Sequence, residues 1–195
     1  MDIVSIKELK PLELVFPTHL ENLSKMIFES GVVDSPIIAD SKTGIVLDGS
    51  HRYIFFLMNG FQEVPVHFVD YMSEDIRVGT HLMHRHIIEG SKGISKKEVI
   101  DRGLSGKLFP PRTTRNFFPF RKNAFSAIPL ESLKQGVSID CASFIANVTK
   151  QEEINHNNRY LEEIEFEFDE LIRYMEEIRH TKNYLKSQVK MMSQN

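Results

Sequence analysis

The chain has 195 residues, 41% of them hydrophobic and 26% charged, which suits one folded domain with an appendage and an ordinary core. The formal net charge of −3 argues against a broad surface for duplex nucleic acid, because such a surface needs an excess of Lys and Arg. The one cysteine, Cys141, excludes an intrachain disulfide and a zinc site built from cysteines. We expect Cys141 to be a small apolar filler.

The sequence shows neither a membrane-crossing segment nor a secretion signal. No run approaches the roughly 18 consecutive apolar residues of a transmembrane helix. The first residues lead into mixed charge, and not into a basic segment followed by an apolar one. We therefore expect a cytoplasmic protein that does not engage a membrane.

The N-terminal part of the chain alternates short strands with helices. Apolar residues at helical spacing predict a helix over 18–31, with Thr18 as its N-cap and Gly31 as its end. Turn-forming residues at 40–43 indicate a hairpin. The elements expected here are strands over 3–8, 35–39, 44–47 and 64–69, and helices over 18–31 and 51–59, the last closed by Gly60.

The middle of the chain is less regular. His81, His84 and His86 lie in a strand-like segment, where His81 would face away from the other two. With no cysteine beside them, we do not expect a metal site. The features expected here are a strand beginning near 76, a helix over 96–102, a basic and aromatic stretch over 109–122 and a short ordered element over 128–133.

Residues 151–195 predict one long helix, so we divide the chain into a domain over 1–150 and this helix. Apolar residues alternate at spacings of three and four, with Lys182 the one polar member, which is typical of a narrow seam. Acidic residues dominate the first half, and only basic charges follow from Arg179 onward. The helix either packs on its own domain or pairs with a second copy as a homodimer. The seam consists of Leu161, Ile164, Phe168, Leu171, Met175, Ile178, Lys182, Leu185, Val189 and Met192.

A strand that ends in Asp48-Gly49-Ser50-His51-Arg52 and continues into a helix is typical of phosphate sites. Gly49 lets the backbone turn and approach a ligand closely. The N–H groups and dipole at the start of the helix favour an anion. Arg52 adds a planar guanidinium group that can bind phosphate oxygens, and His51 adds a hydrogen-bond donor of switchable charge. Asp48 is suited to a magnesium ion or to orienting a hydroxyl group. The alternative interpretation is a capped turn with a surface arginine.

A second polar cluster follows at residues 109–115. It combines a rigid pair of prolines with two hydroxyl groups and two guanidinium groups, which suit a phosphate or a carboxylate better than a core. A basic surface loop is the alternative. The polar groups belong to Arg112, Thr113, Thr114 and Arg115.

Taken together, these segments resemble the ParB/sulfiredoxin superfamily and, more narrowly, its free serine kinases. The resemblance extends in order over about residues 3–134, with 45–53 as its centre. Residues 9–13 are similar to the Lys-Pro-x-Glu segment of these kinases, and 107–115 to their Pro-Lys-Thr-Thr-Arg-His segment. Asn116 stands where that segment has histidine, which removes a charged contact to the substrate.

The resemblance implies an α+β fold, with a ParB/sulfiredoxin-like mixed sheet, flanking helices and the long C-terminal helix behind it. It also implies a kinase that transfers a phosphoryl group from ADP or ATP to the hydroxyl of free L-serine or a close analogue, giving O-phosphoserine. Mg²⁺ is the expected cofactor. The partners would be a nucleotide and a small hydroxy amino acid, and nucleic acid is not expected.

The same resemblance assigns roles to individual residues. Glu13 would accept the hydroxyl proton, since a hydroxyl is a poor nucleophile until a base takes its proton; a solvated loop glutamate is the alternative. Asp48 would share the catalytic centre and hold Mg²⁺. The nucleotide phosphates are expected at Gly49, Ser50, His51 and Arg52, and the substrate at Thr113, Thr114, Arg115 and Asn116, with Arg115 facing its carboxylate.

Functions of other classes stay open. ParB-like relatives bind nucleotide and DNA, and the basic and aromatic residues of 112–122 suit single strands, although the net charge and the lack of a clear helix-turn-helix weaken this alternative. The second alternative is a non-catalytic nucleotide-binding module that assembles through its tail helix. A sulfiredoxin-like reductase is disfavoured, because Cys141 is remote in sequence from Asp48.

Overall fold

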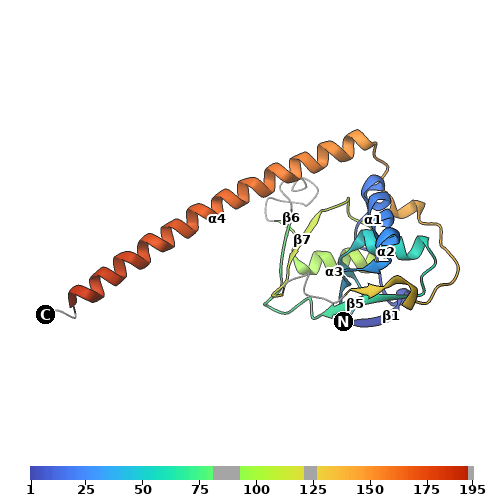
Figure 1. Cartoon of the computed structure of the whole chain (residues 1–195), viewed down its shortest axis with the longest axis horizontal. Helices are drawn as coiled ribbons and strands as arrows, with labels where there is room; N and C mark the ends of the chain where they lie inside the picture. The colour runs from blue at the N-terminus through green and yellow to red at the C-terminus, as the bar shows by residue number, and fades with distance from the viewer. Residues whose placement is uncertain (81–92, 121–126, 193–195) are drawn as a thin grey trace. The chain divides into compact units, whose positions relative to one another are not determined.

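The computed structural model describes residues 1–80, 93–120 and 127–192, and the three histidines between 81 and 86 lie outside them. The chain divides into two units, Met1–Glu153 and Ile154–Asn195 (Figure 1). The helices are α1 (Pro17–Ser30), α2 (Ser50–Met58), α3 (Lys96–Ser105) and α4 (Lys150–Met192). The strands are β1 (Asp2–Ser5), β2 (Val32–Val33), β3 (Ile37–Asp40), β4 (Val46–Asp48), β5 (Glu63–Val69), β6 (Arg77–Thr80), β7 (Thr114–Phe117) and β8 (Ile128–Pro129).

A four-stranded mixed sheet lies at the centre of the first unit, in the order β1-β5-β3-β4. β5 runs antiparallel to β1 and parallel to β3, and β4 runs antiparallel to β3 as the predicted hairpin. The parallel pair needs a crossover, which α2 supplies between β4 and β5. Two further antiparallel pairs, β2–β8 and β6–β7, stand beside this sheet.

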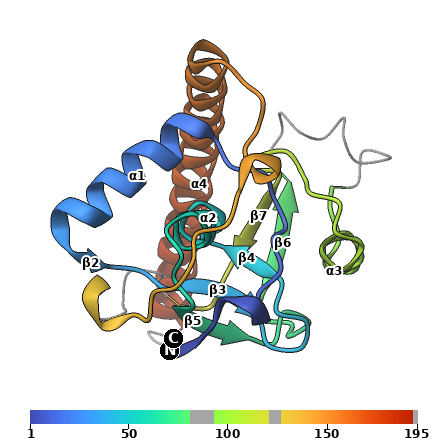
Figure 2. The ribbon, with the colours of Figure 1, turned by 90° about the vertical axis from the view of Figure 1, so that its right-hand side faces the viewer.

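Both faces of the sheet are covered, because α1 and α3 lie on opposite sides of it (Figure 2). All four residues of β3 are buried, since alternate side chains enter two different clusters. Ile37 and Ala39 pack with α1 and α2, whereas Ile38 packs with α3 and Phe109. The central strand therefore joins two cores.

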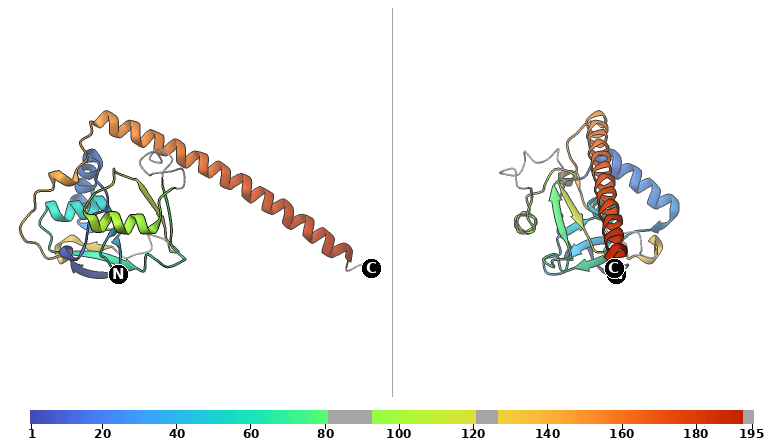
Figure 3. Two further views of the ribbon diagram at one scale, coloured as in Figure 1. Left: turned by 180° about the vertical axis from the view of Figure 1, so that it is seen from behind. Right: turned by 90° about the vertical axis from the view of Figure 1, so that its left-hand side faces the viewer.

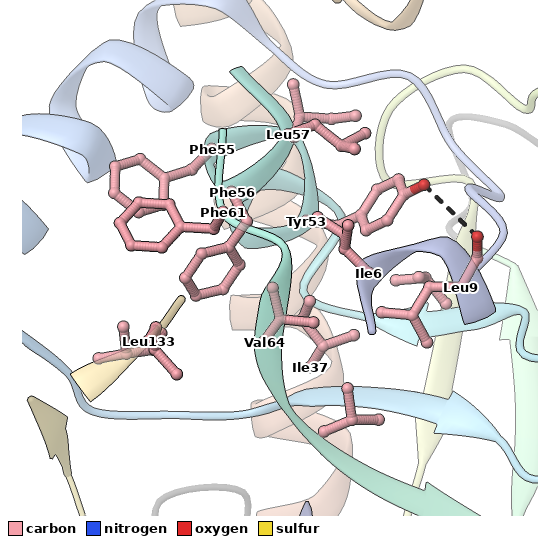
Figure 4. Close-up of a cluster of buried hydrophobic side chains, with 14 of the residues drawn as sticks. Ile6, Leu9, Ile37, Tyr53, Phe55, Phe56, Leu57, Phe61, Val64 and Leu133 are labelled. Atoms are coloured by element: carbon pink, nitrogen blue, oxygen red, sulfur yellow. Dashed lines mark hydrogen bonds between the residues drawn. The ribbon is translucent and has the colours of Figure 1, made fainter. Parts of the chain in front are cut away.

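Aromatic rings from α2 and from the short connection between α2 and β5 dominate the first cluster (Figure 4). Phe55, Phe56 and Phe61 contact one another with ring centroids 5.4 to 6.0 Å apart. Tyr53 donates its hydroxyl proton to the carbonyl of Leu9 at the edge of this cluster. The predicted apolar filler Cys141 is 3% exposed and belongs to the same cluster.

The helix predicted over 18–31 is present as α1, but Thr18 is not its N-cap. The helix begins one residue earlier, at Pro17, whose missing N–H and restricted φ suit a first helical position. The capping carboxylate comes from far along the chain, because Glu153 accepts the N–H groups of Thr18 and His19 at 3.0 and 2.9 Å. A tertiary contact thus replaces the local cap that the sequence predicted.

Other boundaries differ by a few residues. The strand predicted over 3–8 ends at Ser5, where a short 3₁₀ helix, Ile6–Glu8, takes over. The helix predicted over 96–102 continues to Ser105 as α3.

The second unit is the remainder of α4, which is one continuous helix (Figure 3). Most of its large apolar side chains are exposed. Among the described residues, no helix is both long enough and apolar enough to cross a membrane.

Candidate active site

Glu13 lies on the extended segment before α1 and is 9% exposed. This segment pairs with the chain around Phe109, where the N–H of Leu14 donates to the Phe109 carbonyl at 2.9 Å. The pairing brings residues 112–114 to the carboxylate. The N–H of Arg112 donates to Oε2 at 3.0 Å, and the N–H and hydroxyl of Thr114 donate to Oε1 at 2.6 and 2.7 Å.

Burial changes the acidity of Glu13. Loss of hydration raises its pKa from 4.5 to about 7, although the hydrogen bonds from Thr114 and Arg112 oppose the rise. The negative charge of Asp48 raises the pKa further. The alternative of a solvated loop glutamate is therefore excluded. A carboxylate that changes protonation near neutral pH has the properties of a general base.

The predicted turn between strand and helix is present. β4 ends at Asp48, Gly49 has a φ of 91°, and α2 begins at Ser50. Glycine populates positive φ readily, so the chain passes from strand to helix in one residue. No side chain of the described residues caps α2, which leaves its first N–H groups suited to an anion.

Arg52 folds back over this turn. Its Nη2 donates to Asp48 Oδ2 at 3.3 Å and to the Pro36 carbonyl at 3.2 Å. Its Nε is buried and has no hydrogen-bond acceptor within the part of the chain that the structure describes. An arginine with an unmatched donor beside an uncapped helix end favours a phosphate there.

His51 is neutral in this environment. Its Nε2 accepts the N–H of Phe16 at 3.0 Å, which places the ring proton on Nδ1. Burial lowers the pKa of His51 to about 3, and the neighbouring His19, Arg112 and Arg52 lower it as well. The prediction of a donor with switchable charge is therefore corrected, because the burial cannot be seen in the motif. His51 is therefore neutral near pH 7 and carries its ring proton on Nδ1.

Thr114 and Asn116 share one face of β7, as alternate residues of a strand do. Thr114 meets Glu13, and the Asn116 amide donates to the Leu47 carbonyl at 2.8 Å, at the end of β4. The Asn116 oxygen accepts the Tyr71 hydroxyl at 2.9 Å. This face of β7 thus joins the Glu13 segment to the strand that leads into the Asp48 turn.

Two other residues of the segment take different positions. Thr113 is fully buried, and its hydroxyl donates to the Pro110 carbonyl at 2.9 Å, so it shapes the loop from inside. Arg115 alternates to the opposite face of β7 from Thr114, and its guanidinium lies 5.0 Å from the Phe117 ring centroid. The structure does not bring Arg115 to Glu13.

Arg112 and His19 belong to the site and were missed as site residues. Among the described residues, Arg112 is the one non-glycine with positive φ, at 57°. Its guanidinium lies 5.8 Å from the Phe16 ring centroid, and its charge lowers the pKa of His51 and of His19. The sequence placed Arg112 in the polar cluster, but it did not show where the Arg112 side chain would lie. His19 had no signal beyond its place in a helix.

The acidic groups suit a magnesium ion that is shared with phosphates. The charge of Asp48 raises the pKa of Glu13, so the two carboxylates lie near enough to interact electrostatically. Magnesium bound together with substrate phosphates usually takes one or two protein carboxylates. Within 1–80, 93–120 and 127–192, no group of three or more potential ligands forms a metal site by itself.

Comparison with curated proteins finds two relatives, while no family model matches the chain. The ATP-dependent L-serine kinase of Staphylothermus marinus is 34% identical over 82 residues, which cover 40% of this chain and 32% of that protein. The ParB-like protein of Sulfolobus acidocaldarius is 34% identical over 79 residues, which cover 40% of this chain and 39% of that protein. The similarity therefore spans less than half of either relative.

Solved structures with the same fold cover more of the chain. A free serine kinase variant in complex with ADP has a TM-score of 0.58 at 16% identity and covers 68% of this chain and 93% of its own. A conserved hypothetical protein from Pyrococcus furiosus has a TM-score of 0.59 at 16% identity and covers 68% and 97%. The predicted α+β class and the resemblance to free serine kinases are both confirmed: this chain has the fold of the free serine kinase structures.

Proposed function

We propose that the chain is a nucleotide-dependent kinase that phosphorylates the hydroxyl of free L-serine, or of a close analogue, to give O-phosphoserine. The observation that carries this proposal is Glu13, a buried carboxylate with a pKa of about 7 beside the Asp48 turn. The relative named a serine kinase and the solved kinases with ADP and AMP support the choice of donor and acceptor.

In the proposed reaction, Glu13 takes the proton of the substrate hydroxyl. The three hydrogen bonds from Arg112 and Thr114 hold the carboxylate in one orientation. The hydroxyl oxygen forms a bond to the terminal phosphorus, its proton passes to Glu13, and the bond from that phosphorus to the bridging oxygen of the nucleotide breaks. The products are O-phosphoserine and the shortened nucleotide.

The phosphates of the donor would lie at the start of α2. The N–H groups after Gly49, from Ser50 onward, point to this place, and Arg52 adds its unmatched Nε. His51 donates through Nδ1 without carrying charge. Asp48 would hold Mg²⁺, which neutralises part of the phosphate charge when bound.

The acceptor would lie beside Glu13 and the start of β7. Thr114 and Asn116 border this side of the site. We assign the carboxylate of the amino acid to Arg112 in place of Arg115, because the Arg112 N–H bonds to Glu13, whereas Arg115 lies on the opposite face of β7 from Thr114. Thr113 supports the loop from within.

Replacing Glu13 tests the proposal. Wild type, Glu13→Gln and the exposed control Glu21→Gln are incubated with ATP or ADP, Mg²⁺ and L-serine, L-threonine or L-homoserine, and phosphorylated products are identified by mass spectrometry. Loss of the base should lower turnover of Glu13→Gln by at least about 100-fold. Nucleotide affinity, measured by calorimetry, should stay within a few-fold. Equal loss of binding and turnover would remove Glu13 from the role of base.

The ParB-like relative favours one other function, a nucleotide- and DNA-binding regulator. In this structure, however, the backbone N–H of Arg112 and the hydroxyl of Thr114, both within the basic and aromatic stretch, are bonded to Glu13. Nucleotide-dependent binding to DNA that weakens with salt, in a protein that makes no phosphoserine, would decide for the regulator.

A further inference from the structure

The second unit carries an apolar seam along most of its length. Apart from the partly buried Ile164, its apolar side chains are one-half or more exposed, and a groove on this face is lined by Tyr174, Ile178, Leu185 and Val189. An apolar stripe of this length on a helix marks an interaction surface. The exposed fractions are 55% for Leu161, 61% for Phe168, 59% for Leu171, 63% for Met175, 50% for Ile178, 55% for Leu185 and 65% for Val189.

We propose that this seam pairs with the seam of a second copy of the chain, running antiparallel, to form a two-stranded coiled coil. The seam residues repeat at spacings of three and four, which is the pattern of such an assembly. The proposal concerns α4 alone and is independent of the proposed reaction.

The distribution of charge selects the antiparallel direction. Acidic residues are in excess from Glu162 to Glu177, whereas every charge from Arg179 to Lys190 is basic. A parallel pair would place each half beside a half of the same sign. An antiparallel pair places the acidic half of one helix beside the basic half of the other, which is favourable.

Lys182, the polar member of the seam, also favours the antiparallel direction. In a parallel pair in register, Lys182 would face Lys182 of the second copy inside the seam, with two like charges in a partly dehydrated place. In an antiparallel pair it faces an apolar residue, Leu171, and its long side chain extends toward the acidic flank of the other helix.

Matching the two seams along their whole length sets the register. Phe168 then lies level with Leu185 of the second copy, and Met175 with Ile178 near the two-fold axis. In the same register Glu165 flanks Lys186 of the other helix. One register therefore pairs the apolar layers with each other and also places flanking residues of opposite charge side by side, as in a specific coiled coil.

Sedimentation equilibrium of the full chain tests the pairing. The wild type should be a dimer, and Ile178→Asp should raise the dissociation constant at least about 100-fold, because two carboxylates would enter the central layers. His180→Asp introduces the same group on the outer face of the helix and should stay dimeric. A monomeric wild type, a trimer, or equal weakening by both variants would overturn the proposal.

Disulfide cross-linking tests the direction. In a Cys141→Ala background, which has no native thiol, the double variant Phe168→Cys/Leu185→Cys should form a covalent dimer under mild oxidation. Each single variant should remain uncrosslinked, because its cysteine faces an apolar residue of the other copy. Cross-linking of each single variant by itself would show a parallel pair and overturn the antiparallel assignment.

Discussion

At Glu13, two physical effects oppose each other. Burial favours the uncharged acid, while three hydrogen bonds from Arg112 and Thr114 favour the carboxylate. Burial dominates, so the pKa lies near 7 and not far below it. The proton therefore leaves at a pH where the group is still basic enough to take a proton from a substrate hydroxyl.

The activity should follow this ionisation. We expect kcat/KM for serine to rise as the pH increases through about 7, because only deprotonated Glu13 acts as a base, and to fall about tenfold per pH unit below it. Steady-state rates between pH 5.5 and 8.5 measure the profile, with Glu21→Gln as a control that keeps it. A rate that is flat from pH 5.5 upward would contradict the assignment.

His51 should make the fold sensitive to acid. Its folded-state pKa is about 3 against 6.5 in an unfolded chain, so the unfolded state binds the proton first and stability is lost as the pH falls below 6.5. The loss is at most about 1.4 kcal/mol per pH unit. His51→Gln keeps an acceptor for the Phe16 N–H but does not titrate. Urea unfolding at pH 7.5, 6.5 and 5.5 should show a smaller pH dependence for this variant, and equal slopes would refute the buried neutral ring.

At the scale of elements, local sequence signals set some helix ends, and tertiary contacts set others. Gly31 ends α1 with a φ of 66°, and Ser95 and Glu98 form a capping box at α3, because these stop and start signals act within one turn. The start of α1 did not follow the local signal at Thr18. Its cap is Glu153, which no spacing rule connects to residue 18.

The cap that Glu153 supplies should be measurable. Glu153→Gln removes the charge beside the N-terminus of α1 and weakens two hydrogen bonds, so we expect a loss of about 1–2 kcal/mol in the free energy of unfolding. Glu162→Gln, at an exposed position of α4, should have little effect. Chemical denaturation compares the two, and equal stability of both variants would contradict the cap.

At the scale of the molecule, the two units are stabilised by different means. Met1–Glu153 has two internal cores joined by β3, whereas the described part of the second unit, 154–192, has an exposed seam and no hydrophobic core of its own. Most of the stability of a helix in a protein comes from packing of its apolar face. Its stability should therefore depend on the partner that covers the seam.

Hydrogen exchange should separate the units. Peptides from β3 and β5 should exchange slowly and at the same rate at low and high protein concentration, because their protection comes from internal cores. Peptides from the second half of α4 should become more protected as concentration rises, since the dimer covers them. Mass spectrometry at two concentrations checks this, with Ile178→Asp as the variant that loses the dependence. Concentration-independent protection of α4 would count against the dimer.

Local residue patterns predicted the order of most elements and the Asp48-Gly49 turn, because periodicity and glycine and proline chemistry act over a few neighbouring residues. The fold class, and the expectation that these segments share one site, came from the resemblance to the free serine kinases. Tertiary packing is what sets the pKa of Glu13 near 7, keeps His51 neutral and directs the Arg115 guanidinium to the Phe117 ring. Burial and side-chain direction arise where segments 99 residues apart pack together, and local spacing carries no record of them.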